Sequence, residues 1–355
     1  MNISKLQFEA IELLKDLIQT PSFSREEDAT AGLLVNWFKD HNISFERHLN
    51  NVWAVNKYFD SSKPTLLLNS HHDTVKPNAG YTRDPFEPNI ENGKLFGLGS
   101  NDAGGCLVSL LATFTYFYFA EDLEYNILFA GTAEEEINGK NGIAGLLSFL
   151  PKIDVAIVGE PTLMQMAIAE KGLVVFDAVV NGTSSHAAHP NNDNPIYKTA
   201  EVLKWFENFR FEKVSAALGE VKLTVTQIHA GSQHNVVPAN VSLVIDVRVN
   251  DCYTNSEIDQ ILKKQAPVDE ITARSLRLNS SFIPKEHHLV QAGIELGMKT
   301  YGSPTLSDQA MLTCPSLKLG PGDSTRSHTA DEFIYIREIE EGIELYIKLL
   351  EKTLK

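Results

Sequence analysis

The chain has 355 residues, more than one hydrophobic core usually supports, so two domains are expected. Its content of 43% hydrophobic and 22% charged residues is that of a globular protein, and no apolar stretch approaches the length of a membrane span. The formal net charge of −15 argues against nucleic acid and anionic membrane surfaces as partners.

The cysteines and the N-terminus bear on the compartment. The sequence has three scattered cysteines and no CxxC motif, so at least one thiol stays unpaired, which suits a reducing compartment. The N-terminus lacks the basic segment and apolar core of a secretory signal. We therefore expect a cytoplasmic protein.

Apolar patterns predict alternating helices and strands in the first part of the chain. Helices are predicted over residues 3–18, 22–38, 106–119 and 143–150, and strands over residues 45–58 (as a pair), 64–69, 126–131 and 154–158. The last three strands are short apolar runs, so we expect them to be buried in a sheet between helices.

The pattern changes after Gly172 and returns after Glu286. Between them, strands are predicted over residues 173–181, 221–228, 241–249 and 271–278, with helices over 195–209 and 256–264. A helix over 289–296, a strand over 316–320 and a helix over 336–350 follow. The predicted fold is α/β: a discontinuous main domain (1–171 and 284–355) with a mixed, largely parallel sheet flanked by helices, and an inserted α+β lid (172–283).

Chemically active side chains follow four of the strands of the main domain. These are His71 and Asp73, the acidic triplet 134–136, Glu160, and His328. Alone, each has a plainer explanation: a hydrogen-bonded core histidine, a solvated acidic turn, a helix cap and an exposed loop residue. Because α/β sheets bind ligands at the carboxyl ends of their strands, we expect the four groups to meet at one edge.

Such a set of His, Asp and Glu without Cys favours Zn²⁺, Co²⁺ or Mn²⁺ in a catalytic site. Acids gathered at the end of a buried strand repel one another and need a positive charge nearby. Two metal ions need many protein ligands, and a bridging carboxylate reduces that number. Asp102, in the glycine-rich segment 96–105, is the natural bridge.

Over nearly its whole length the chain resembles the M20 family of dinuclear zinc amidohydrolases and peptidases. It is most similar to the acetylornithine deacetylases and succinyl-diaminopimelate desuccinylases within that family. The motifs that carry the resemblance are Ser70–Val75, Gly97–Asp102, Glu135–Glu136, Gly159–Pro161, and Gly320–Gly322 leading to His328.

The resemblance implies a ligand set for two zinc ions, with Co²⁺ or Mn²⁺ as alternatives. His71, Asp102 and Glu160 would hold one metal ion. Asp102, Glu136 and His328 would hold the other.

The resemblance also implies roles for two further carboxylates. Glu135 would be the general base, and Asp73 would orient the imidazole of His71. The family's usual Asp-Glu-Glu falls on residues 134–136, so Glu134 is the extra acid. A shift of one position would exchange the roles within the triplet.

The lid resembles the family's dimerisation domain. His186, in the segment 182–190, would enter the active site of the partner subunit in a homodimer. Asn235 would contact the substrate. Arg248 would either clamp a substrate carboxylate or form a surface ion pair.

The implied function is removal of an acetyl or succinyl group from an Nα-acyl amino acid such as N-acetylornithine, in arginine biosynthesis. Citrulline or diaminopimelate could replace ornithine, and an exopeptidase or dipeptidase could use the same site. A non-catalytic binding protein on this fold is the third alternative, which the presence of all the ligand positions and Glu135 disfavours.

Overall fold

The computed structural model describes residues 2–355, which form two compact units. Unit 1 contains residues 2–168, Phe282–Tyr301 and Ser307–Lys355, and unit 2 contains Ala169–Ser281 and Gly302–Leu306. The short segment 302–306 thus belongs to unit 2, although it was predicted to lie in the main domain. That each unit is a domain with its own role remains a prediction.

Unit 1 is built on a nine-stranded sheet with the order β1-β2-β6-β3-β7-β17-β8-β15, in which β16 also pairs with β8. The strands are β1 (Glu46–His48), β2 (Asn51–Val55), β3 (Thr65–His71), β6 (Asn126–Thr132), β7 (Val155–Val158), β8 (Met166–Glu170), β15 (Ser281–Phe282), β16 (Thr300–Ser303) and β17 (Ser316–Lys318). The central strands β6, β3, β7 and β17 are parallel, whereas β2 and β8 join them antiparallel. The mixed α/β class predicted from the sequence is confirmed.

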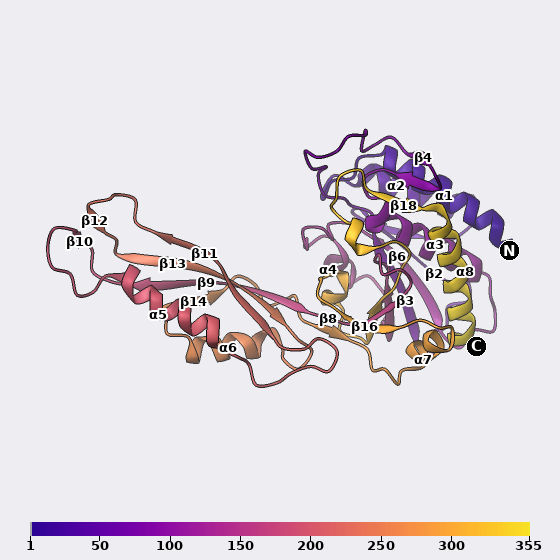
Figure 1. Cartoon of the computed structure of the whole chain (residues 1–355). Coiled ribbons are helices and arrows are strands. Elements are labelled where there is room, and N and C mark those ends of the chain that lie inside the picture. The colour runs from indigo at the N-terminus through magenta and orange to yellow at the C-terminus, as the bar shows by residue number, and fades with distance from the viewer. Residues whose placement is uncertain (1) are drawn as a thin grey trace. The chain divides into compact units, whose positions relative to one another are not determined.

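The apolar strands are buried on both faces because helices or loops cover each side. Leu66 and Leu68 point into the larger core and Leu67 into the smaller one on the other face. The larger core is covered by α1 (Ile3–Gln19), α2 (Asp28–Asp40), α3 (Gly105–Phe117), α7 (His288–Glu295) and α8 (Ile336–Thr353). Of these, α1, α3 and α8 pack side by side (Figure 1).

The smaller core lies under α4 (Ile143–Leu146) and the 3₁₀ turn η2 (Asp308–Met311). The helix predicted over 143–150 is wrong in its second half, since α4 ends at Leu146 and turns lead to Pro151. A separate small sheet of β4 (Asn89–Glu91), β5 (Lys94–Phe96) and β18 (Phe333–Tyr335) was not predicted.

Unit 2 contains an antiparallel sheet with the order β11-β13-β9-β14. Its strands are β9 (Gly172–Asn181), β11 (Lys222–Ala230), β13 (Asn240–Val249) and β14 (Glu270–Ala273), and its helices are α5 (Pro195–Asn208) and α6 (Asn255–Gln265). Figure 1 shows both helices on one side of the sheet, where alternate residues of β9 and β13 are buried. The strand predicted over 271–278 ends early, at Ala273.

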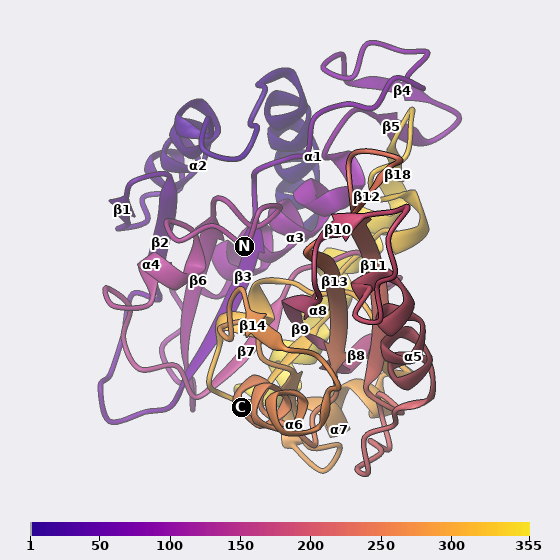
Figure 2. The same cartoon turned by 90° about the vertical axis from the view of Figure 1, so that its left-hand side faces the viewer.

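A two-stranded ribbon of β10 (Ser185–His186) and β12 (Val236–Val237) completes unit 2, and its strands lie side by side in both views (Figures 1 and 2). Within residues 2–355, no helix combines the length and the apolar character that crossing a bilayer requires.

Candidate metal centre

The centre lies at the carboxyl ends of the parallel strands of unit 1. His71 is the last residue of β3 and pairs in register with Thr132, the last residue of β6. The acidic triplet follows Thr132 directly, and Glu160 follows β7 after one residue. Because these strands are parallel, their ends bring the three groups to one edge of the sheet, as predicted.

His71 is a buried histidine with one ring nitrogen facing the acids. Its Nδ1 lies 3.0 Å from the main-chain carbonyl oxygen of Asp73, to which it donates a hydrogen bond. Its Nε2 is buried and has no hydrogen-bond partner among the described residues. In the neutral form that binds metal ions, an imidazole with Nδ1 protonated carries its lone pair on Nε2, so Nε2 of His71 is the atom that would face a metal ion.

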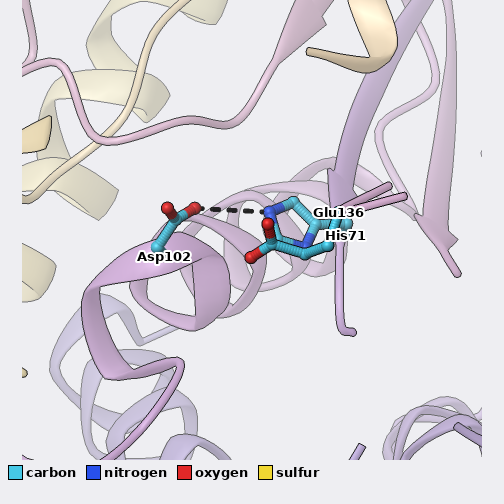
Figure 3. Close-up of side chains that lie close together, drawn as sticks. All are labelled: His71, Asp102 and Glu136. Atoms are coloured by element: carbon cyan, nitrogen blue, oxygen red, sulfur yellow. Dashed lines mark ion pairs between the residues drawn. The ribbon is translucent and has the colours of Figure 1, made fainter. Parts of the chain in front are cut away.

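Carboxylate oxygens surround Nε2 of His71. Nε2 of His71 lies 3.4 Å from Oδ1 of Asp102, 3.9 Å from Oε2 of Glu135 and 4.0 Å from Oε1 of Glu160. Figure 3 shows Asp102 directed at the ring of His71, with Glu136 beside the same ring. These separations leave room for a cation between the groups.

His328 reaches the centre from the loop after the turn η3 (Ser324–Arg326). Its Nε2 lies 3.0 Å from Oε2 of Glu136 and 3.6 Å from Oδ2 of Asp102. Hydrogen bonding to Glu136 is the main reason why the pKa of His328 is raised to about 9. Its backbone has a φ of +58°, a left-handed conformation that non-glycine residues rarely adopt and that often marks functional sites.

Asp102 stands between the two histidines. Oδ1 faces His71 and Oδ2 faces His328. It is carried by the turn η1 (Ser100–Gly104), which opens α3. One carboxylate therefore presents one oxygen to each histidine, which is the arrangement that a bridging ligand would need.

The buried acids create a strongly anionic site. Burial and neighbouring carboxylates raise the pKa of Glu135 well above its usual value and that of Glu160 to about 8, against the opposing effect of His71. A cation placed between these acids would stabilise their ionised forms and offset their mutual repulsion. Together with the unpartnered Nε2 of His71, this donor set fits Zn²⁺, Co²⁺ or Mn²⁺.

Two groups of donor atoms lie within 4.8 Å of one another: His71, Asp102 and Glu136, and His71, Glu135 and Glu160. The five predicted ligands and Glu135 are thus gathered in one place, but Glu135 approaches as closely as a ligand. Either Glu135 or Glu136 could therefore be the metal ligand, which is the exchange of roles that a shift of one position in the acidic triplet would give.

Asp73 contacts both the acidic turn and the imidazole of His71. Its carboxylate accepts hydrogen bonds from the main-chain N–H groups of Glu135 at 3.0 Å and Glu136 at 3.2 Å and from the hydroxyl of Ser24 at 2.7 Å. Burial alone would raise the pKa of Asp73, but the hydrogen bonds and the charge of His71 outweigh it and lower that pKa. The carboxylate lies 3.4 Å from Nδ1 of His71, farther than the main-chain carbonyl.

Glu134, the extra acid of the triplet, serves the following loop. Its carboxylate accepts hydrogen bonds from the side chain of Asn141 at 2.9 Å and from the main-chain N–H of Asn141 at 3.4 Å. A side chain at Gly139 would collide with Glu134, so glycine is required there for this packing. Glu134 itself has a φ of +55°.

Two buried acids near the centre were not predicted from the sequence. Glu332 is 2% exposed and accepts hydrogen bonds from the main-chain N–H groups of Gly99, Asn101 and Asp102. Burial and the charge of Asp102 raise the pKa of Glu332 to about 8. In the sequence, only the position of Glu332 shortly after His328 indicates a role near the centre.

The second missed acid is Asp308, at the start of η2. Its Oδ2 accepts a hydrogen bond of 2.7 Å from the hydroxyl of Thr132, whose own oxygen accepts one from the side chain of Asn69. Burial raises the pKa of Asp308 to about 6. This contact connects η2 to the end of β6, immediately before the acidic turn.

Two of the predicted residues of unit 2 lie together. His186 is in β10, and the N–H of the next residue, Ala187, donates to the carbonyl oxygen of Asn235 at 3.0 Å. Both His186 and Asn235 are exposed.

Arg248 lies near the other end of unit 2's long strand β13, which begins at Asn240. Its guanidinium group donates to both carboxylate oxygens of Asp246, at 2.9 and 3.2 Å. This contact is the surface ion pair that the sequence analysis gave as the alternative, and the role of carboxylate clamp stays a prediction.

Comparisons with known proteins place the chain among metal-dependent hydrolases. Acetylornithine deacetylase from Shigella sonnei (strain Ss046) is 29% identical over 374 residues, covering 96% of both chains. Aminopeptidase PepT from Bacillus cereus has the same fold, with a TM-score of 0.77, 16% identity and 98% of each chain covered. A dinuclear metal-binding peptidase of the M20 family from Bacillus subtilis has a TM-score of 0.76, 14% identity and 99% of each chain covered.

Residues 67–352 match the family described as peptidase family M20/M25/M40. This span includes every residue of the metal centre, from His71 to Glu332. The chain therefore belongs to peptidase family M20/M25/M40, whose members are metal-dependent hydrolases.

Proposed function

We propose that the protein hydrolyses the amide bond of an Nα-acyl amino acid such as N-acetylornithine, releasing acetate or succinate, in arginine biosynthesis. The observation that carries this proposal is the position of Asp102 between His71 and His328, with Glu135 beside them. That arrangement suits a two-metal amide hydrolase. The similarity to an acetylornithine deacetylase over 96% of the chain supports the choice of substrate.

In this proposal, His71, Asp102 and Glu160 hold one zinc ion, and Asp102, Glu136 and His328 hold the other. Co²⁺ or Mn²⁺ could replace zinc. When bound, the metal ions would lower the pKa of a water molecule and polarise the carbonyl group of the substrate.

Glu135 would act as the general base. Its Oε2 would take a proton from the attacking water and deliver it to the amine nitrogen as the amide bond breaks, so that a carboxylate and a free amine result. Burial raises the pKa of Glu135, so its carboxyl group can keep this proton between the two steps.

Unit 2 would complete the site in a homodimer. His186 of one subunit would donate a hydrogen bond to the oxyanion that develops in the active site of the other. Asn235, whose carbonyl oxygen accepts from the residue after His186, would contact the substrate. Arg248 would bind the substrate carboxylate only if it left Asp246.

A second candidate is an exopeptidase or dipeptidase. Solved structures of the same fold include an aminopeptidase from Bacillus cereus and a tripeptidase from Staphylococcus aureus. A succinyl-diaminopimelate desuccinylase and a non-catalytic binding protein are the remaining alternatives.

A substrate panel on the zinc- or cobalt-loaded protein separates these candidates. The panel should contain acetyl and succinyl derivatives of ornithine, citrulline and diaminopimelate, together with dipeptides and tripeptides. The proposal expects the highest kcat/KM on an Nα-acyl amino acid. A preference for unblocked peptides would replace it with the exopeptidase, and metal binding without any turnover would favour the binding protein.

A further inference from the structure

Glu332 is a buried carboxylate whose oxygens are taken up by the turn that presents Asp102. Oε1 accepts from the N–H groups of Asn101 at 2.8 Å and Asp102 at 2.9 Å, and Oε2 accepts from the N–H of Gly99 at 3.2 Å. Its side chain is not a member of the candidate ligand groups among the described residues. It acts on the backbone of a ligand instead.

The turn needs such an acceptor because the N–H groups at the start of a helix have no acceptor within that helix. The turn η1 begins at Ser100, and Asp102 has φ −117° and ψ 99°, outside the helical range. The carbonyl oxygens of Gly99 and Ser100 accept from Gly104 and Gly105. Buried N–H groups need partners, and here one side chain supplies them for three residues.

Glu332 also belongs to the segment that carries His328. The carbonyl oxygen of His328 accepts from the side chain of Asn78 at 3.1 Å, and that of Glu332 accepts from the N–H of Gly97 at 3.0 Å. Both ends of the segment 328–332 are thus fixed to the surrounding loops. One buried side chain joins the segment of one histidine ligand to the turn of the bridging carboxylate.

We propose that Glu332 is a positioning residue of the metal centre: it fixes the turn of Asp102 relative to His328 and thereby sets the affinity and geometry of the two metal positions. This inference rests on the proposed metal-dependent function. It adds a residue that neither holds the metal ions nor touches the substrate.

The variant Glu332→Gln tests the proposal because it keeps the size of the side chain. Its amide has one oxygen and one NH₂ group, so the NH₂ group must face an N–H of the turn. Changes of this kind around metal ligands typically weaken metal binding by about 10–100-fold. We expect a loss of that size in Co²⁺ affinity and a changed visible absorption spectrum of the bound Co²⁺.

Asp154→Asn is the matched control. The carboxylate of Asp154 accepts the N–H of Thr65 at 3.0 Å, at the opposite end of β3 from His71. This variant also disturbs a carboxylate-to-backbone hydrogen bond, but far along the strand from the metal ligands. It should bind Co²⁺ with the affinity and spectrum of the unchanged protein.

Both variants and the unchanged protein are stripped of metal and titrated with Co²⁺ by calorimetry and visible absorption. If Glu332→Gln binds Co²⁺ as the unchanged protein does, the proposal is wrong while the proposed function stands. If the unchanged protein itself binds no Co²⁺, both fail.

A second measurement needs no variant and covers the case in which Glu332→Gln does not fold. Hydrogen exchange on the metal-free protein should find the amides of Asn101 and Asp102 strongly protected, because Glu332 holds them before any metal binds. Exchange of these two amides at the rate of an open loop would overturn the proposal.

Discussion

Oδ1 of Asp73 and the main-chain nitrogen of Glu135 lie 3.0 Å apart, joined by a hydrogen bond. The other oxygen of Asp73 accepts from the main-chain N–H of Glu136 and from the hydroxyl of Ser24. One buried carboxylate therefore fixes both the proposed base and a proposed ligand through their backbone, from a position two residues after His71. Asp73 connects the ends of β3 and β6 at the centre of the site.

Replacing Asp73 with Asn should destabilise the acidic turn. The amide group would present an NH₂ to an N–H group and leave a buried donor unsatisfied, which costs about 1–3 kcal/mol. We expect the free energy of unfolding of the metal-free protein to fall by this amount and kcat to fall as well. Urea denaturation and a turnover assay measure the two effects, and the milder variant Ser24→Ala should show a smaller loss in both.

Replacing Glu135 with Gln should separate catalysis from metal binding. The amide cannot accept the proton of the attacking water, so kcat should fall by about 10²–10⁴-fold. Metal content, measured by elemental analysis, should remain that of the unchanged protein. Retained turnover would assign the base to another residue.

The neighbouring acids provide controls for that experiment. Glu134→Gln should keep most of the activity, since Glu134 binds Asn141 and not the centre. Glu136→Gln should lose metal, because its carboxylate meets His328. If instead Glu136→Gln keeps its metal and loses turnover, the roles of residues 135 and 136 are exchanged.

The sheet of unit 1 was predictable because its central strands are short apolar runs. Because Leu66, Leu67 and Leu68 are consecutive and apolar, both faces of their strand must be buried. This requires helices or loops on each side of the sheet. The small sheet with β4 was not predictable, since residues 89–91 are all exposed and lack an apolar pattern. Short strands such as β15 depend on partners distant in sequence.

The gathering of His71, Asp102, Glu136, Glu160 and His328 in one place was predictable because strand ends and motif spacing both indicate it. Glu332 was not, because it acts on the N–H groups of residues more than two hundred positions earlier. Asp308 likewise acts through Thr132. Main-chain hydrogen bonds of this kind have no local sequence pattern, so only the folded chain reveals them.

Removing the metal ions should lower the thermal stability. Acids that share a cation in the folded state repel one another without it, and a ligand present at a hundred times its Kd stabilises by about 2.7 kcal/mol. The melting temperature of the metal-depleted protein should therefore rise when Zn²⁺ is added. Differential scanning fluorimetry over a zinc series measures this.

A pair of histidine variants shows whether the stabilisation arises at the proposed centre. His328→Ala removes a proposed ligand whose side chain is 55% exposed, so it leaves no cavity in the core, and it should reduce both the metal content and the rise in melting temperature. His229→Ala removes an exposed histidine of β11 and should change neither. An equal response of both variants would place the metal elsewhere.

The proposed contribution of His186 across a homodimer can be tested by mixing two inactive proteins. Glu135→Gln lacks the base and His186→Ala lacks the oxyanion donor, so each homodimer should turn over slowly while binding metal normally. If His186 acts in the partner subunit, a mixed dimer contains one site with both residues intact, and random exchange should restore about a quarter of the original activity. Light scattering establishes the dimer, and the mixture is assayed after the subunits have exchanged. A mixture no more active than its components would mean that His186 acts within its own subunit or not at all, and loss of metal in His186→Ala would make it a ligand instead.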